Sequence, residues 1–144
     1  SLAHEVFGER GVSIPETTLP DASLEELEAQ GKALRLAMQG SAGQTGYASG
    51  EQSLASDLFQ MALQYGYGDI WHRPGLDHKS RVLCALAAFT VLWCEPQLRG
   101  FLKAALSLGW QQSEIVEIIM HTAPYGGFPR ALNALTLAQE VLGG

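Results

Sequence analysis

Hydrophobic residues recur at helical spacing along most of the chain, and no stretch shows the strict alternation of a half-buried strand. Ser23 and Glu26 have the spacing of a capping box, and the apolar stripe behind them predicts a first helix that ends at Gly40. The stretch 40–50 contains four glycines together with several small polar residues. It predicts a flexible connection with little to bury.

A second helical stripe follows this connection and is predicted to end at Gly66. The stripe predicts one buried face, made by Leu54, Leu58, Met61, Ala62 and Tyr65. Residues 66–76 are too rich in Gly, Pro and aromatic residues for regular structure, yet too apolar for a solvated loop. We therefore expect this segment to line a site.

The second half of the chain predicts four more helices, so the expected fold is all-α with about six helices. Asp77 caps the third helix, and Pro96 fits the first turn of the fourth, which Gly109 ends. We expect these two helices to form an antiparallel hairpin. Ser113 is the predicted cap of the fifth helix, which Pro124 breaks. The predicted spans are 77–93, 96–109, 113–123 and 130–142.

Residues 1–22 show no sustained period and predict an N-terminal arm, which leaves 23–144 as one helical domain. A chain of 144 residues with 47% hydrophobic content can build one packed core. Its formal charge of −6 comes from 15 acidic against 9 basic residues. A nucleic-acid partner is therefore not expected, because the phosphate backbone would be repelled.

The chain contains no apolar run near the roughly 20 residues that span a bilayer, and residues 1–10 lack the pattern of a signal peptide. Cys84 and Cys94 lie ten residues apart in helical sequence, too far along one helix to bridge each other. We therefore expect a cytoplasmic protein in a reducing compartment, with no membrane partner. Cys84 is expected in the core.

Three blocks of sequence, at 67–77 (YGDIWHRPGLD), 95–99 (EPQLR) and 121–135 (HTAPYGGFPRALNAL), resemble the carboxymuconolactone decarboxylase family of the alkylhydroperoxidase-like superfamily. The likeness extends over about 24–142. It implies an all-helical subunit with a central antiparallel hairpin, assembled into a ring-like homo-oligomer, a trimer or hexamer, with pockets near subunit contacts. Members of this family either decarboxylate a small lactone acid without a cofactor or reduce peroxides through two cysteines.

The motif of the peroxidase branch is largely missing from this chain. Its first cysteine falls on Cys94, but its second falls on Gln97, its histidine on Phe101 and its relay glutamate on about Val82. Disulfide chemistry needs both an attacking and a resolving thiol, so a peroxidase is disfavoured. Cys94 is either a lone reactive thiol or, the interpretation we favour, a structural residue.

Decarboxylation leaves an electron pair that must delocalise, so a site needs a cation or hydrogen-bond donor for the oxyanion and a proton donor to carbon. Arg73 is the candidate anchor for a substrate carboxylate. The alternative is that it braces its loop through Asp69 or Asp77. His121 is the candidate proton donor or acceptor, oriented by Glu117, and its alternative is a surface or interface residue that caps the helix.

Tyr125 completes the catalytic set as a candidate hydrogen-bond donor to the oxyanion. Aromatic residues, including Trp93, can wall an apolar cavity, although such residues are more often core or subunit contacts. Glu95 is either a base or simply a favourable partner of the helix dipole. His72 and His78 lack a third ligand, so no metal site is expected. The predicted substrate-binding residues are Trp71, Cys94, Glu95, Phe101 and Phe128.

The sequence thus predicts a cofactor-independent lyase or isomerase that acts on a small lactone or unsaturated organic acid, as in aromatic or secondary metabolism. The expected partners are this substrate and other copies of the chain. A non-catalytic helical oligomer that binds a small ligand is the alternative, and it is favoured by Phe101 at the position where the decarboxylases commonly have a histidine. A thiol-dependent antioxidant through Cys94 comes third.

Overall fold

The computed structural model describes residues 2–13, 21–40 and 56–143, and all regular structure within these ranges is helical, as predicted. The elements are α1 (Leu2–Glu9), α2 (Leu24–Gln39), α3 (Ser56–Met61), the π-helix η4 (Ala62–Asp69), the 3-10 helix η5 (Ile70–His72), α4 (His78–Leu92), α5 (Glu95–Ser107), α6 (Gln112–His121), α7 (Ala123–Gly126) and α8 (Phe128–Leu142). The predicted connection at 40–50 lies, apart from Gly40, outside the described residues.

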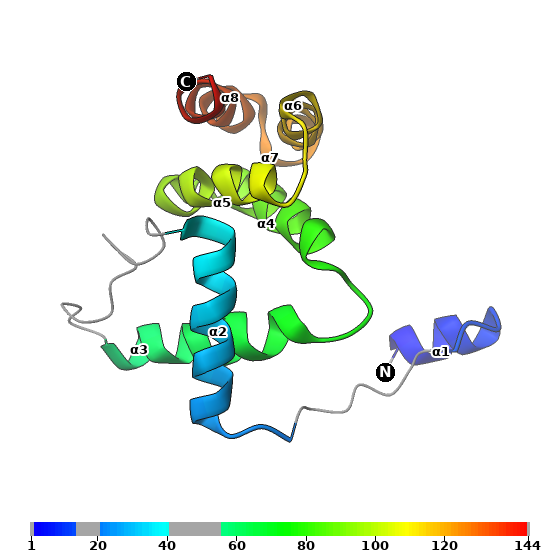
Figure 1. The fold of residues 1–144 in the computed structure, drawn as a ribbon. Helices are drawn as coiled ribbons and strands as arrows, with labels where there is room; N and C mark the ends of the chain where they lie inside the picture. Colours follow the sequence, from blue (N-terminus) through cyan, green and yellow to red (C-terminus); the bar gives the residue numbers. More distant parts are fainter. Residues whose placement is uncertain (1, 14–20, 41–55, 144) are drawn as a thin grey trace.

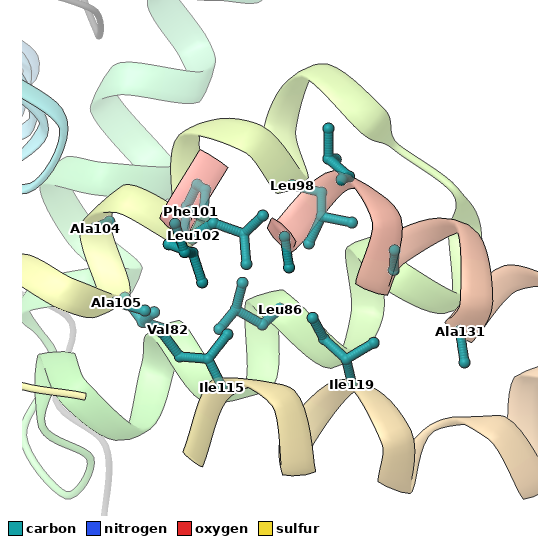
Figure 2. Packing of buried hydrophobic residues seen from close by; sticks show 14 of the residues in the cluster. Val82, Leu86, Leu98, Phe101, Leu102, Ala104, Ala105, Ile115, Ile119 and Ala131 are labelled. Atoms are coloured by element: carbon teal, nitrogen blue, oxygen red, sulfur yellow. The ribbon is translucent and has the colours of Figure 1, made fainter. Parts of the chain in front are cut away.

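The predicted hairpin of α4 and α5 is confirmed and lies in the middle of the molecule. Helices α6 and α8 cover one side of it, while α2 crosses η4 on the other (Figure 1). Side chains from α4, α5 and α6 meet in the main core (Figure 2). Burial of this apolar surface is the main force that holds the layers together. The fully buried residues include Leu86, Leu98, Leu102, Ile115 and Ile119.

The hairpin has defined ends. Asp77 caps α4, and its carboxylate accepts a hydrogen bond from the Ser80 amide over 2.8 Å. Trp93 ends α4 in the left-handed conformation, with φ of 55°. At the open end, Trp110 donates its indole N–H to the carbonyl of Lys79, whose ammonium group lies 4.3 Å from the Trp110 ring centre.

Two glycines allow α2 and η4 to cross in backbone contact. A Cβ atom at Gly31 would overlap the carbonyl oxygen of Leu63, and one at Gly68 would overlap that of Leu27. Only glycine fits both positions without moving a backbone. The crossing fixes η4, and through it the segment that leads into α4.

The prediction that Gly66 ends the second helix was wrong. The chain continues through Gly66 as η4 to Asp69 and then as η5 to His72. Between Gly66 and α4, only residues 73–77 lack helical structure. The reason is tertiary: packing against α2 outweighs the weak helix propensity of glycine.

The buried face predicted for this helix was also wrong. Leu58, Met61, Ala62 and Tyr65 are exposed, and Leu54 lies outside the described residues. Leu58 and Met61 lie in α3, none of whose residues is buried, and Ala62 and Tyr65 lie in η4. A π-helix bonds residue i to i+5, so the buried positions of η4 repeat at a wider spacing than the 3.6 residues used for the prediction. The buried residues are Leu63, Gln64, Gly68 and Asp69.

Residues 2–9 of the predicted arm form α1, which stands away from the helical layers (Figure 1). Several smaller expectations need correction. Helix α6 begins one residue before Ser113, and the amide of Gln111 donates to Glu114 there. Pro124 breaks α6 but lies in the first turn of α7. Cys84 is exposed, because α4 turns Val82, Leu86 and Thr90 towards the core instead.

Candidate active site

The loop 73–77 is tied to the first turns of α4. Arg81 donates from Nη2 to the carbonyl of Arg73 over 2.7 Å and from Nε to that of Leu76 over 3.0 Å. The side chain of Ser80 also donates to the carboxylate of Asp77 over 3.1 Å. These contacts, with the Asp77 cap, hold the loop in one position beside the hairpin.

Four aromatic rings connect this segment to the hairpin, and we call them the aromatic wall: Tyr67, Trp71, Phe101 and Phe89. Tyr67 stacks on Trp71 with ring centres 5.9 Å apart, and Trp71 contacts Phe101 at 5.7 Å. Phe101 meets Phe89 edge-on at 5.1 Å. Such tilted and offset contacts are favourable for aromatic rings. The wall therefore joins η4, η5, α4 and α5 at one place.

Phe101 is the deepest member of the wall, with 3% of its surface exposed, whereas Trp71 is half-buried. The structure thus brings Trp71 and Phe101, two of the residues predicted to bind substrate, into direct contact. The histidine that decarboxylases commonly have at position 101 would therefore lie beside Trp71.

Arg73 lies directly after η5, next to the wall in sequence, and forms a bidentate ion pair with Asp69. Its Nε and Nη2 donate to the two carboxylate oxygens over 3.0 and 2.7 Å. Hydrogen bonding from Arg73 lowers the pKa of Asp69, and the same contact raises the pKa of Arg73. The predicted bracing interaction with Asp69 is therefore present in the isolated chain.

His72 and His78 flank the loop, and sequence reasoning considered them only as metal ligands. His72 Nδ1 lies 2.8 Å from the Tyr67 carbonyl oxygen, and His78 Nε2 lies 3.0 Å from that of Trp71. Their rings are 5.8 Å apart and nearly perpendicular, and the His78 ring is 6.2 Å from Trp71. The clue in the sequence was the pair of histidines on either side of a Pro-Gly turn. No set of three or more metal-binding side chains gathers anywhere in the described ranges.

His121 and Tyr125 form a second, exposed group. Their rings are 5.6 Å apart, and Tyr125 is 79% exposed. Among the described residues, Glu117 makes no hydrogen bond to His121, so the predicted orienting contact is absent there. Phe128, in the first turn of α8, is 67% exposed.

The loop that carries Arg73 and the segment that carries Tyr125 contact α4 near opposite ends. Arg81, near its start, contacts the loop of Arg73. Gly126, next to Tyr125, packs against Val91 near its end, where a Cβ on the glycine would come within 2.5 Å of Val91 Cγ2. Ten residues of α-helix separate these contacts, or about 15 Å. Among the described residues, none of these contacts joins Arg73 directly to Tyr125 within one subunit.

Two of the residues predicted to bind substrate, Cys94 and Glu95, lie at the start of α5. Cys94 is the half-buried N-cap residue of α5. Glu95 is exposed and forms an ion pair with Arg99 over 3.3 Å, and Arg99 also contacts Glu140 over 3.3 Å. Exposed pairs of this kind contribute little stability.

The sequence is similar to known proteins of one family. A model described as the carboxymuconolactone decarboxylase family matches residues 56–140. The chain is 33% identical over 85 residues to the 4-carboxymuconolactone decarboxylase of Acinetobacter baylyi, which covers 59% of this chain and 63% of that protein. It is 31% identical over 85 residues to the nitrosuccinic acid decarboxylase npaB of Metarhizium robertsii, covering 58% of each.

A third relative is an uncharacterized 15.0 kDa protein from the nqo9-nqo10 intergenic region of Paracoccus denitrificans, 40% identical over 81 residues, or 55% of this chain and 60% of that protein. The chain thus spans about three fifths of the length of the curated relatives it matches. Across the described residues, no helix is both long and apolar enough to cross a bilayer. Since the family model covers more than half of the sequence, the chain belongs to the carboxymuconolactone decarboxylase family.

Proposed function

We propose that the protein is a cofactor-independent, decarboxylase-like carbon–carbon lyase or isomerase that acts on a small lactone or unsaturated organic acid. Two of its relatives are named decarboxylases, and this likeness supports a decarboxylase-type function at the level of the family. The names of both relatives describe substrates that carry carboxylate groups.

The observation that carries the proposal is the contact between Trp71 and Phe101 at 5.7 Å, close in the chain to the charged group of Arg73. Small-molecule sites combine apolar surface with a few placed polar groups. The aromatic wall supplies the apolar surface, and the guanidinium of Arg73 supplies a charge for a carboxylate.

The ion pair with Asp69 is compatible with this role. A guanidinium has five N–H donors, and Asp69 occupies two of them, so three remain for a ligand. In this proposal Asp69 fixes the direction of the Arg73 side chain, and the remaining donors bind the substrate carboxylate. The bracing role and the anchoring role then belong to the same residue.

The chemistry needs no redox step. The bond from a ring carbon to the departing carboxylate breaks, and its electron pair delocalises onto the ring carbonyl while CO2 leaves. Arg73 binds a carboxylate that the substrate keeps, and its positive charge also stabilises the negative charge that develops, because a fixed charge in a partly buried site needs no reorganisation. A proton donor to carbon then completes the reaction.

His121, Tyr125 and Phe128 remain predicted site residues, and in this proposal they meet Arg73 from a second copy of the chain. We propose that the protein self-associates, as a trimer or hexamer. This proposal is supported by four apolar side chains on the neighbouring helices α6, α7 and α8, which we call the α6–α8 patch: Met120, Tyr125, Phe128 and Leu132. All four side chains are exposed.

The test is a mass-spectrometric assay with 4-carboxymuconolactone, nitrosuccinic acid and a panel of unsaturated acids, without added cofactor. We expect loss of CO2 or an isomerised product. Arg73→Lys keeps the charge but loses the planar fork, so kcat/KM should fall at least about tenfold, equivalent to roughly 1.4 kcal/mol. Arg99→Lys on α5, which changes only the exposed ion pairs with Glu95 and Glu140, is the matched control.

A non-catalytic helical oligomer that binds a small ligand is the second candidate function. It is favoured by one observation, the burial of Phe101 at the position where a proton-handling histidine is common in the decarboxylases. Binding of a panel compound without turnover, weakened by Arg73→Lys, would favour this candidate over the lyase.

A further inference from the structure

His78 is the half-buried histidine that touches the aromatic wall. Its ring lies 6.2 Å from Trp71, which in turn contacts Phe101 at 5.7 Å. Position 101 is where the proton-handling histidine is missing. His78 therefore places an imidazole one ring away from that position, on the same end of α4 as Arg73.

The backbone around His78 fixes which of its nitrogens is free. Nε2 lies 3.0 Å from the carbonyl oxygen of Trp71, which can only accept, so Nε2 carries the hydrogen in the neutral ring. Nδ1 is then left with its lone pair and can take up or deliver a proton. His72 is held in the opposite sense, with Nδ1 on the Tyr67 carbonyl and Nε2 free.

We propose that His78 delivers the proton to a carbon of the enolate that is left when CO2 departs, so that it replaces the histidine absent at position 101. This inference rests on the proposed lyase function and adds a catalytic residue to it. When the carbon–carboxylate bond has broken, protonated Nδ1 gives its hydrogen to a carbon of this enolate, the electron pair returns from the carbonyl oxygen, and a new C–H bond forms. The neutral imidazole then recovers a proton from water, so charge and atoms balance.

His78 is better placed for this step than His121. It contacts the same wall as the substrate and lies one helical turn from Arg81, which holds the loop of Arg73. His121 is exposed, and its described ring contact is with Tyr125 at the far end of α4. Within one subunit, the anchor and the proton donor thus come from a single end of the hairpin.

The competing explanation is that His78 only fastens the loop through its bond to Trp71. The substitution His78→Gln separates the two roles. The glutamine amide can donate to the Trp71 carbonyl, as His78 does, but it cannot transfer a proton at neutral pH. The comparison needs His78→Gln, His78→Ala, His121→Gln and, as a control in α1, His4→Gln. Each purified variant is checked for thermal midpoint and assembly before the assay with 4-carboxymuconolactone and nitrosuccinic acid.

We expect His78→Gln to fold and assemble like the original protein while kcat falls by about 10²- to 10⁴-fold, the usual contribution of general acid–base catalysis. Added imidazole should restore part of the turnover of His78→Ala. Normal turnover in His78→Gln would overturn the proposal in favour of the fastening role. Loss of turnover in His121→Gln alone would assign proton transfer to the other end of α4.

Failure of the proposed function is distinguishable from failure of this inference. If the original protein turns over neither compound, the lyase function is contradicted before any variant is compared. Titration with 4-carboxymuconolactone, followed by the ¹⁵N resonances of the His78 ring, then tests whether a ligand binds next to His78, independently of turnover. A shift that Arg73→Lys weakens supports a ligand site at His78, and unchanged resonances overturn it.

Discussion

At the residue scale, the ion pair of Asp69 and Arg73 is the most consequential contact near the candidate site. The Asp69 side chain is 10% exposed and that of Arg73 34%, so solvent only partly screens the pair. The hydrogen bond from Arg73 lowers the pKa of Asp69 in the folded protein. The folded protein therefore stabilises the ionised form of the Asp69 carboxyl group relative to the unfolded chain.

This difference makes a prediction for stability against pH. The contribution of Asp69 is fully present above its unfolded pKa of about 3.9, and it is lost as pH falls through the lower folded pKa. Asp69→Asn should therefore have a lower thermal midpoint than the original protein at pH 7, and the gap should narrow below about pH 4. Thermal midpoints of both proteins between pH 7 and pH 2.5 measure this. A gap that is constant across this range would contradict the assignment.

At the element scale, the crossing of α2 and η4 sets the position of the aromatic wall relative to the hairpin. The two backbones touch at Gly31 and Gly68, and η4 leads directly into η5, which carries Trp71. Any side chain at the crossing would push η4 away from α2. The loop 73–77 and the wall would then shift relative to the hairpin.

Two neighbouring glycines of η4 allow a matched test of the crossing. Gly68→Ala should lower the free energy of unfolding by about 3 kcal/mol or more, because its Cβ meets the backbone of Leu27, which cannot yield as a flexible side chain can. Gly66 has nothing within 4 Å of an added Cβ, so Gly66→Ala should be neutral or stabilising by up to about 1 kcal/mol. Urea unfolding of both variants measures the difference. Equal effects would show that the close crossing does not control stability.

At the scale of the whole molecule, one subunit leaves a large amount of apolar surface uncovered. The α6–α8 patch gathers Met120, Tyr125, Phe128 and Leu132 within thirteen residues of sequence, on three elements that contact one another. Large contiguous apolar patches on a protein surface mark interaction sites. A second copy of the chain is the partner that we propose for this patch.

A buried charge at the patch should prevent assembly. Leu132→Asp is expected to shift the protein from the trimer or hexamer to a monomer, because an unpaired carboxylate is costly to bury in an interface. The helical content should remain, since Leu132 is exposed in the subunit. Light scattering coupled to size-exclusion chromatography measures the mass, with Lys103→Glu on an exposed position of α5 as the control. A monomeric original protein would contradict self-association itself, and an unchanged oligomer in Leu132→Asp would place the interface elsewhere.

Local sequence signals were enough to predict the helical class, the α4–α5 hairpin and most helix starts. These features depend on local chemistry: the Ser23 and Asp77 caps and the apolar period of the regular α-helices act within a few residues. The blocks at 67–77, 95–99 and 121–135 likewise pointed to the family, which the match over 56–140 shows.

The course of η4 and the grouping of the candidate site residues depend instead on packing between elements. A glycine that weakens an isolated helix is required where two backbones cross, as at Gly68, so local propensity predicted a stop where packing continues the helix. Likewise, the sequence suggested Arg73 and His121 for one site, but the described contacts of Arg73 are with Asp69 and Arg81, and the ring contact of His121 is with Tyr125. Folding brings His78 to Trp71 instead, because distances between elements depend on how they pack and not on residue type.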